Sequence, residues 1–247
     1  MNIRSFVPRP AKVGLRWAQR RWADYQSGMY GQLAGPTNTD IVSLAPALEL
    51  EQPIMPSAFF ENKVHNMQTA ATRIQQVLLL PGQVFSFWHV VGYPGARKGY
   101  KKGRNLVAGK VQGDYGGGLC QVSGLLYYIA LATGLDILER HSHSIDIYAE
   151  EDRFAPLGAD ATVVFGYKDL RFRNNTAHTL RFHLTANTQR IRAAVSCSGP
   201  LSAATPEFIR TDMPGRRVVQ TLVGGKTVAV SEYLLPLPIP PLPNLHQ

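Results

Sequence analysis

The sequence predicts an α+β domain in which early helices precede a later mixed or antiparallel sheet, with a nucleophile-type cysteine at a helix N-terminus. Apolar residues at helical spacing occur before residue 134, and short alternating patterns separated by turn residues follow it. Helices and strands in separate parts of a chain favour α+β over an alternating α/β architecture. An apolar fraction of 45% with 9% aromatic residues is typical of a globular core.

Residues 1–57 predict a basic helix followed by an irregular connection. The first 22 residues carry six basic side chains and no acidic one. Leu15, Ala18, Trp22 and Tyr25 recur at the spacing of one helical face. This stripe either packs on the domain or lies on an anionic bilayer, as basic amphipathic helices with tryptophan do. Residues 26–57 are rich in Gly, Pro, Ser, Thr and Asn, which favours a loop.

The main domain is predicted to occupy residues 58–200 and to begin with a helix at 59–80. Pro81 and Gly82 end this helix, and the weak alternation of 83–91 predicts a strand. Residues 98–110 predict a basic loop that contains glycines. A second helix is predicted from Cys120 to Thr133, and Gly134 ends it.

Strand patterns fill the rest of the chain. They cover 135–148, 161–165, 169–173, a hairpin of 178–184 with 189–197, and a hairpin of 217–223 with 226–233. The second hairpin makes residues 201–235 a C-terminal extension of the domain. Residues 236–247 contain five prolines and predict a polyproline-type tail without a core of its own.

The run Gly116-Gly117-Gly118-Leu119-Cys120 is the sharpest local feature of the sequence. Consecutive glycines adopt positive φ and let the backbone approach a ligand closely. Because Cys120 begins an apolar helix, the free amides and the helix dipole there would stabilise its thiolate and lower its pKa. The amides of residues 119–122 would also hold an oxyanion, with Gly117, Gly118, Gln121 and Ser123 lining the substrate. The alternative is a buried cysteine at a tightly packed turn.

A nucleophilic cysteine needs a base and a group that orients the base. On a strand that continues past Glu139, His141 and His143 share one face, and the helix before this strand would bring both back to Cys120. Asp160 is a candidate to orient the histidine, and an ordinary turn aspartate is the alternative. Cys197 has no comparable setting and is interpreted as structural.

Two other interpretations stay open at this point. Cys120, His141 and His143 would supply three zinc ligands and leave one position open. No established zinc spacing accompanies them, and we expect neither a metal nor another cofactor. Lys101, Lys102 and Arg104 in the basic loop would receive a substrate carboxylate or simply face solvent.

The charge balance and the hydropathy restrict the partners and the compartment. A net charge of +9 favours an anionic partner. We expect no nucleic acid, because zinc-finger spacing, RNP aromatics and a basic helix with heptads are missing. No stretch approaches the ~18 apolar residues of a membrane span, and the first residues lack the apolar segment of a secretory signal. These patterns predict a cytoplasmic protein, with a peripheral position at the inner face of the membrane as the alternative.

Several segments stand together in an order that is typical of a known family. They are Val84-Phe85-Ser86-Phe87, Val91-Gly92, Gly99-Tyr100-Lys101, Gly116-Gly117-Gly118-Leu119-Cys120-Gln121-Val122-Ser123, Leu126-Tyr127, Glu139-Arg140-His141-Ser142-His143-Ser144 and Asp169-Leu170-Arg171-Phe172-Arg173-Asn174-Asn175-Thr176. Over about residues 75–190 the chain therefore resembles the VanW-like family.

The resemblance implies a cell-wall role. Members of the family are associated with glycopeptide resistance and the bacterial cell envelope, and some resemble L,D-transpeptidases, which cross-link peptidoglycan through a cysteine acyl-enzyme. Carried over, this implies Cys120 as nucleophile, His143 or His141 as base, and a peptidoglycan stem peptide or its precursor as partner. His143 is preferred because its serine neighbours crowd it less than Arg140 crowds His141. The alternative is a non-catalytic module that binds a wall precursor or a membrane surface.

Overall fold

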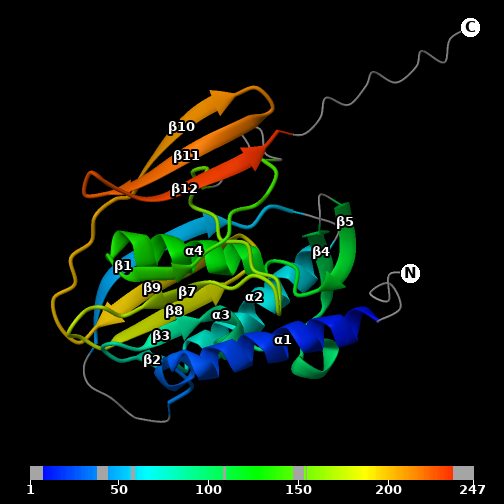
Figure 1. The fold of residues 1–247 in the computed structure, drawn as a ribbon, viewed down its shortest axis with the longest axis horizontal. Coiled ribbons are helices and arrows are strands. Elements are labelled where there is room, and N and C mark those ends of the chain that lie inside the picture. Colours follow the sequence, from blue (N-terminus) through cyan, green and yellow to red (C-terminus); the bar gives the residue numbers. More distant parts are fainter. Residues whose placement is uncertain are drawn as a thin grey trace, which may run out of the picture.

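The computed structural model describes residues 8–37, 44–56, 59–107, 110–146, 153 and 155–235. Two helices, α2 (Phe60–Ile74) and α4 (Leu119–Ala132), pack on one antiparallel sheet (Figure 1). The strands of this sheet stand in the order β1 (Ala45–Pro53), β9 (Arg190–Cys197), β8 (Leu180–Ala186) and β2 (Leu78–Leu79). The α+β class predicted from the sequence is confirmed.

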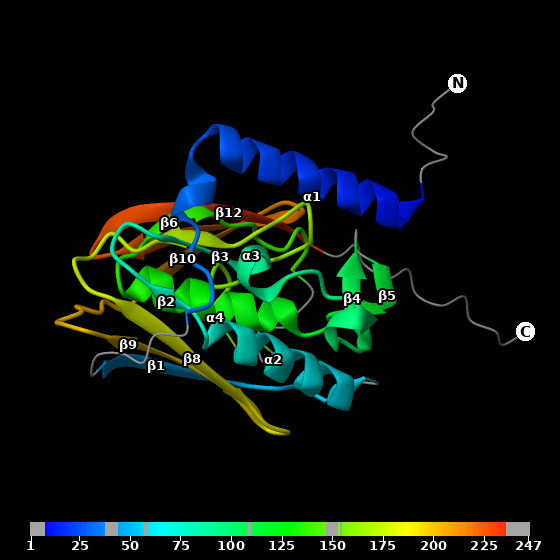
Figure 2. The same cartoon turned by 90° about the horizontal axis from the view of Figure 1, so that it is seen from below.

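Three smaller sheets complete the domain. They are β3 (Val84–Ser86), β7 (Arg171–Arg173) and β6 (Asp136–Glu139); the hairpin of β4 (Lys102–Val107) and β5 (Lys110–Tyr115); and β10 (Glu207–Met213), β11 (Arg216–Val223) and β12 (Lys226–Leu234). Both views show α4 between the β10–β12 sheet and the sheet that contains β8 and β9 (Figures 1 and 2). A helix covered on two sides must be apolar nearly all round, which explains the composition of α4.

The predicted helix at 59–80 ends early, at Ile74. Leu78 and Leu79 continue the apolar spacing of the helix, but they pair with Arg181 and Leu180 as the edge strand β2. The predicted strand at 83–91 divides into β3 and a short helix, α3 (Phe87–Val91), which is capped by Ser86 accepting a hydrogen bond from the backbone N–H of His89. Both corrections concern short apolar runs, for which periodicity does not distinguish a strand from a helix.

The predicted strand at 135–148 is also too long. Within the described part of this range only Asp136–Glu139 form a strand, β6, so His141 and His143 lie after it and not on one of its faces; residues 147 and 148 lie outside the described residues. The predicted strand at 161–165 is a loop with one isolated bridge, between Val164 and Lys168. Conversely, β1 lies in the predicted connection 26–57, β4 lies in the predicted basic loop, and β10 was not predicted. β1 depends on the remote strand β9, whereas β4 and β10 form hairpins with the next strands in the chain, β5 and β11.

Both predicted hairpins are present. β8 and β9 pair from Leu180 with Cys197 to Ala186 with Ile191, and β11 and β12 pair across Gly224-Gly225. Local turn residues and alternation are sufficient to specify such pairings. The predicted proline-rich tail at 236–247 lies outside the described residues.

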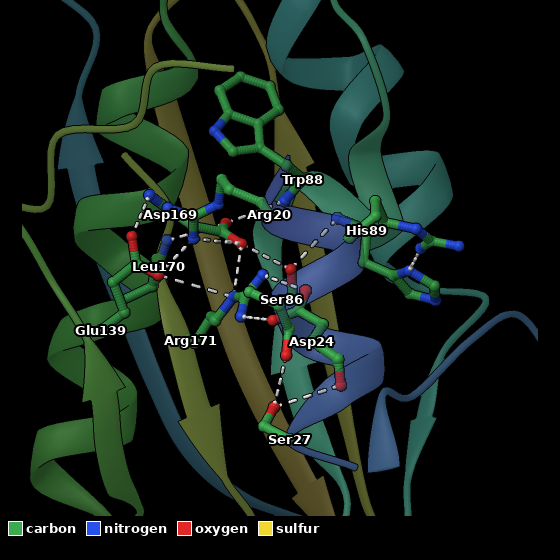
Figure 3. A network of polar contacts seen from close by, with 12 residues as sticks. Arg20, Asp24, Ser27, Ser86, Trp88, His89, Glu139, Asp169, Leu170 and Arg171 are labelled. Atoms are coloured by element: carbon green, nitrogen blue, oxygen red, sulfur yellow. Dashed lines mark hydrogen bonds and ion pairs between the residues drawn. The ribbon is translucent and has the colours of Figure 1, made fainter. Parts of the chain in front are cut away.

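The remaining helices are α1 (Arg9–Gln26), confirmed as predicted, and two 3-10 turns at Met29–Gln32 and Ala96–Lys98. Ion pairs and the packing of Trp17 on Phe165 hold α1 on the domain. Arg171 of β7 donates to both carboxylate oxygens of Asp24, at 2.6 and 2.8 Å, and Arg20 pairs with Glu139 of β6 (Figure 3).

The apolar stripe of α1 does not pack on the domain. Leu15, Trp22 and Tyr25 are 61%, 63% and 68% exposed. The interpretation that this stripe faces the core is therefore wrong, and Asp24 and Trp17 lie on the inner side instead. Among the described residues, no helix combines the length and the apolar character needed to cross a bilayer.

Candidate functional site

Cys120 is the second residue of α4, directly after a turn made by the three glycines. Gly116 and Gly118 have φ of +88° and +96°, a region that favours glycine. A Cβ at Gly118 would lie 2.9 Å from Cγ of Lys63 and 3.2 Å from the Lys63 carbonyl oxygen. Backbone conformation and close packing on α2 therefore both require glycine here.

A buried asparagine holds this turn against the neighbouring loop. Asn66 of α2 donates to the carbonyl oxygens of Gly117 and Lys101, at 3.2 and 3.0 Å, and accepts from the backbone N–H of Lys101 at 2.8 Å. Asn66 has no exposed surface. Asn66 is absent from the predicted site residues, although a polar residue on the apolar face of a predicted helix is a signal that could have identified it.

The amides at the start of α4 are not all free. The N–H groups of Leu119, Gln121 and Val122 donate to the carbonyl oxygens of Gly116 or Gly118. The backbone N–H of Cys120 has no acceptor within the described part of the chain. One amide, that of the cysteine itself, is thus available to an anion beside the thiol.

The side chains that follow Cys120 tie α4 to its surroundings. The Ser123 hydroxyl is buried and donates to the carbonyl oxygen of Ala161 at 2.6 Å. The Gln121 amide donates to the carbonyl oxygen of Pro53 at 2.8 Å. Neither side-chain donor is therefore free to meet a substrate in this arrangement.

His143 and Asp160 lie beside Cys120. The His143 ring lies close enough to the Cys120 thiol for each group to shift the pKa of the other, and its Nδ1 lies 2.6 Å from Oδ2 of Asp160. Because Nδ1 contacts the carboxylate, Nε2 is the ring nitrogen that remains for the thiol. The same Oδ2 accepts the backbone N–H of His143 at 2.7 Å. The Cys120 Sγ also lies 3.8 Å from the carbonyl oxygen of Val163.

This arrangement favours an ionised pair. Burial raises the pKa of the Cys120 thiol, but the hydrogen bond and charge of His143 outweigh burial and bring that pKa below its ordinary value. Burial lowers the pKa of His143, whereas hydrogen bonds to Asp160 and Cys120 raise it to about 10. The two groups titrate together, and both pKa shifts favour the pair of thiolate and imidazolium over the pair of neutral groups.

Asp160 is held in turn by groups from two other segments. Arg140 donates to its Oδ1 at 2.9 Å and to its backbone oxygen at 2.7 Å, and the Tyr233 hydroxyl donates to Oδ1 at 2.5 Å. Burial raises the pKa of Asp160, but its contacts with His143, Arg140 and Tyr233 hold the pKa well below its usual range. Arg140 also bonds Ser231 and stacks over the ring of Tyr127 at 4.8 Å.

Sequence patterns alone indicate no role for Arg140 or Tyr233. Arg140 lies inside the Glu139-Arg140-His141 motif, so its place beside the candidate histidines is a sequence signal that could have identified it. Tyr233 is 1% exposed and comes from β12, 113 residues after Cys120. No local pattern could connect the two.

His141 is not part of the cysteine cluster. Its Nε2 lies 3.0 Å from Oε1 of Glu139, on the side of the ion pair with Arg20. The three zinc ligands considered above do not converge, and the described residues contain no group of three His, Cys, Asp or Glu side chains placed to hold a metal ion. Cys197 is buried at the end of β9.

The predicted basic loop is the β4–β5 hairpin, joined to α2 near the glycine turn. Lys101 and Lys102 are exposed, and Asn62 of α2 donates to the Lys102 carbonyl oxygen at 2.8 Å. The side chain of Arg104 lies outside the described structure. No acidic partner of Lys101 or Lys102 occurs within the described ranges.

The fold and the site together define an α+β protein with a cysteine, a histidine and an aspartate aligned at the start of a helix. The chain belongs to the VanW-like protein family, whose model matches residues 62–196. That range includes Cys120, His143 and Asp160, whereas Tyr233 lies beyond it.

Two relatives show how far the similarity extends. The chain is 37% identical over 131 residues to the Vancomycin B-type resistance protein VanW of Enterococcus faecalis, covering 53% of this chain and 48% of that protein. It is 31% identical over 180 residues to the Uncharacterized protein YoaR of Bacillus subtilis, covering 67% of this chain and 57% of that protein. The chain thus spans about half the length of these curated relatives. No solved structure matches.

Proposed function

We propose that the protein is a cysteine acyl-transfer enzyme that acts on peptidoglycan stem peptides or their precursors. The observation that carries this proposal is the line of contacts from the Cys120 thiol through His143 to Asp160. It provides a nucleophile, a proton-transfer group and an orienting carboxylate in one cluster. Structural cysteines do not require this combination.

In this proposal each group has one role. The Cys120 thiolate attacks an amide carbonyl carbon and forms a C–S bond, and the Cys120 N–H donates to the developing oxyanion. The His143 imidazolium gives its proton to the leaving amine as the C–N bond breaks, which leaves a thioester. An acceptor amine then attacks the thioester, His143 takes its proton, and the thiolate is released with the new amide. Asp160 keeps the His143 ring in orientation throughout.

The substrate class rests on the family. The similarity to a vancomycin resistance protein supports a cell-envelope role, and an amide in a stem peptide is a bond that a cysteine acyl-enzyme can exchange. The chain's net charge of +9 is consistent with anionic wall material or precursors.

The first experiment measures the reactivity of Cys120 against pH. The protein carries Cys197→Ser, is alkylated with iodoacetamide, and is followed by intact mass. We expect the pH of half-maximal reactivity, the alkylation midpoint, to lie below ~8.5, the pKa of a free thiol. Adding His143→Ala should raise this midpoint. His141→Ala is the matched control and should leave the midpoint unchanged, because His141 contacts Glu139.

The second experiment looks for the acyl-enzyme. The protein is incubated with a synthetic stem pentapeptide, and the mass gain expected for a thioester is sought. Cys120→Ala should abolish both this mass gain and any transfer to an added amine. An alkylation midpoint equal to that of a free thiol and unchanged by His143→Ala would refute the mechanism. Full turnover by Cys120→Ala would refute it as well.

A non-catalytic binding module is the second candidate. Exposed Lys101 and Lys102, without an acidic partner in the described ranges, favour it because they would attract an anionic wall precursor. This candidate predicts binding that survives Cys120→Ala but weakens with added salt and with Lys101→Gln plus Lys102→Gln. Isothermal titration with the stem peptide distinguishes the two candidates.

A further inference from the structure

The outer face of α1 is apolar, although solvent covers it. Leu15, Trp22 and Tyr25 are more than three-fifths exposed, and Trp22 and Tyr25 stack with ring centroids 6.0 Å apart. Figure 2 shows α1 along the side of the molecule away from β8 and β9, with its outer side uncovered. Side chains of this size are rarely grouped in the open on a soluble surface without a role.

Aromatic residues from other segments extend this face. Tyr30 follows α1, Tyr93 follows α3, and Tyr167 lies beside the helix; they are 41%, 52% and 45% exposed. Arg16 and Arg21 of α1 lie over the rings of Tyr167 and Tyr30, at 5.9 and 4.2 Å. We call the outer side of α1 together with these three tyrosines the α1 face.

Two hollows lie beside α1. One has a volume of about 680 Å³ and lies between α1 and α3, with Trp17, Trp88 and Phe165 in its wall. The other, of about 340 Å³, is bounded by Ala18, Trp22, Tyr25 and Tyr30. Arg21 borders both hollows. The first hollow is therefore on the inner flank of α1, where Trp17 packs on Phe165, and the second borders the outer stripe, with the guanidinium of Arg21 at the edge between them.

The charge of the α1 face has one sign. At helical spacing Lys12 and Arg16 lie on one flank of the apolar stripe, and Arg21 lies on the other. None of the three has an acidic partner among the residues that the structure describes; Arg21 contacts a ring nitrogen of His89 and the Tyr30 hydroxyl. Asp24 is the acidic residue of α1, and it is buried against Arg171.

We infer that the α1 face binds the surface of a bilayer that contains anionic lipid. Apolar and aromatic side chains would enter the region between head groups and acyl chains, while Lys12, Arg16 and Arg21 meet lipid phosphates. The protruding stripe on a single helix favours a bilayer over nucleic acid, for which aromatic residues line a groove that follows the strand. The unpaired cations on both flanks disfavour a second copy of the chain, because two such faces would repel.

The inference does not depend on the chemistry of Cys120. It does place the candidate site near the lipid surface. Trp17 of α1 packs on Phe165, with ring centroids 4.6 Å apart, and the Cys120 thiol contacts the carbonyl oxygen of Val163, two residues before Phe165. Buried ion pairs hold α1 on the domain, so the face is a fixed surface (Figure 3).

Vesicle co-sedimentation of the full chain tests the inference. The vesicles are phosphatidylcholine alone, or phosphatidylcholine mixed with phosphatidylglycerol. We expect binding to the mixed vesicles that weakens with salt, and roughly fivefold weaker binding for each of Lys12→Gln and Arg16→Gln. Trp22→Ala with Tyr25→Ala should reduce binding by at least roughly tenfold. Val230→Ala with Arg216→Gln is the matched control on the exposed side of the C-terminal sheet, because Val230 is 63% exposed, and it should bind like the unmodified chain.

Tryptophan fluorescence gives an independent signal. Mixed vesicles should shift the emission to the blue, and Trp22→Phe should remove most of that shift while far-UV circular dichroism stays unchanged. Equal binding to both vesicle types, or equal loss in the control variant, would overturn the inference. The inference would also be overturned if the α1 variants left vesicle binding unchanged and instead altered the binding of a single-stranded oligonucleotide or the oligomeric state. Alkylation of Cys120 is measured separately, so failure here leaves the proposed function standing.

Discussion

At the scale of single residues, Asp160 joins the histidine of the candidate site to two side chains from other segments. It accepts from the ring and the backbone of His143, from Arg140 and from Tyr233. Each donor stabilises the charged carboxylate, which is why its pKa lies well below the usual range even though burial opposes this. The same shift makes Asp160 a source of stability that depends on pH.

Asp160→Asn should remove stability that is present at neutral pH and lost in acid. In the unfolded chain the carboxyl titrates near ~3.9, and in the folded chain it titrates lower. A lowered pKa contributes stability above the unfolded value and loses it as pH falls toward the folded value. The difference in free energy of unfolding between the native chain and Asp160→Asn should therefore shrink by about 1 kcal/mol from pH 7 to pH 3.

Urea unfolding at several pH values measures that difference. Asp136→Asn, at an exposed position of β6, serves as the control and should show no such change. A constant difference across this pH range would mean that the contacts of Asp160 do not stabilise its charged form.

At the scale of elements, α1 shows that a helix can be held by buried charge while its apolar stripe faces outward. Arg171 makes a two-pronged contact with Asp24 and a further one with Asp169 at 3.0 Å. The side chains of Arg171 and Asp24 are 9% and 10% exposed. Removing one member of such a pair leaves the other charged and poorly solvated.

Asp24→Ala should therefore destabilise the protein by about 3–5 kcal/mol and expose α1 to protease. Urea unfolding and limited trypsin digestion measure the two effects. Glu51→Ala removes the exposed pairs with Arg190 and Arg192 and is the matched control; it should change stability little or not at all. Similar losses in both variants would show that the α1 pair is not effectively buried.

At the scale of the whole molecule, the C-terminal sheet reaches the candidate site from outside the family match. β12 supplies Tyr233 to Asp160 and Ser231 to Arg140, and Arg217 of β11 pairs with buried Asp146. Gly158, with φ of +101°, lies so close to Phe208 and Val219 that a Cβ would be 2.8 Å from each. The sheet is therefore packed directly on the loop that carries Asp160.

Tyr233→Phe tests whether this contact positions the site. The ring would stay packed, but Oδ1 of Asp160 would lose a donor and the carboxylate could turn away from His143. We expect the pKa of His143 to fall from about 10, the alkylation midpoint of Cys120 to rise, and stability to drop by roughly 1–3 kcal/mol.

Tyr128→Phe is the control, because the ring of Tyr128 packs near that of Phe208, with centroids 6.0 Å apart. Tyr128 has no hydrogen bond to Asp160 among the described residues. It should leave the midpoint of Cys120 unchanged. A loss of stability in Tyr233→Phe without a shift of the alkylation midpoint would show that Tyr233 is structural only.

The sequence by itself determined features that local physics controls. The α+β class, α1, the start and end of α4 and the two hairpins followed from spacing, glycine positions and turn residues. The glycine turn placed Cys120 at a helix start, and the neighbouring motif contained His143. These inferences needed only residues within about one element of each other.

Only the tertiary structure decided features that depend on distant partners. The edge strands β1 and β2 exist because β9 and β8 pair with them, and β6 ends at Glu139, so its alternation did not orient His141 and His143. The contact of Asp160 with Tyr233 spans 73 residues. The outward direction of the α1 stripe was decided by Asp24 and Arg171, 147 residues apart. Periodicity shows that a helix has two faces, but the buried partner determines which of them lies inside.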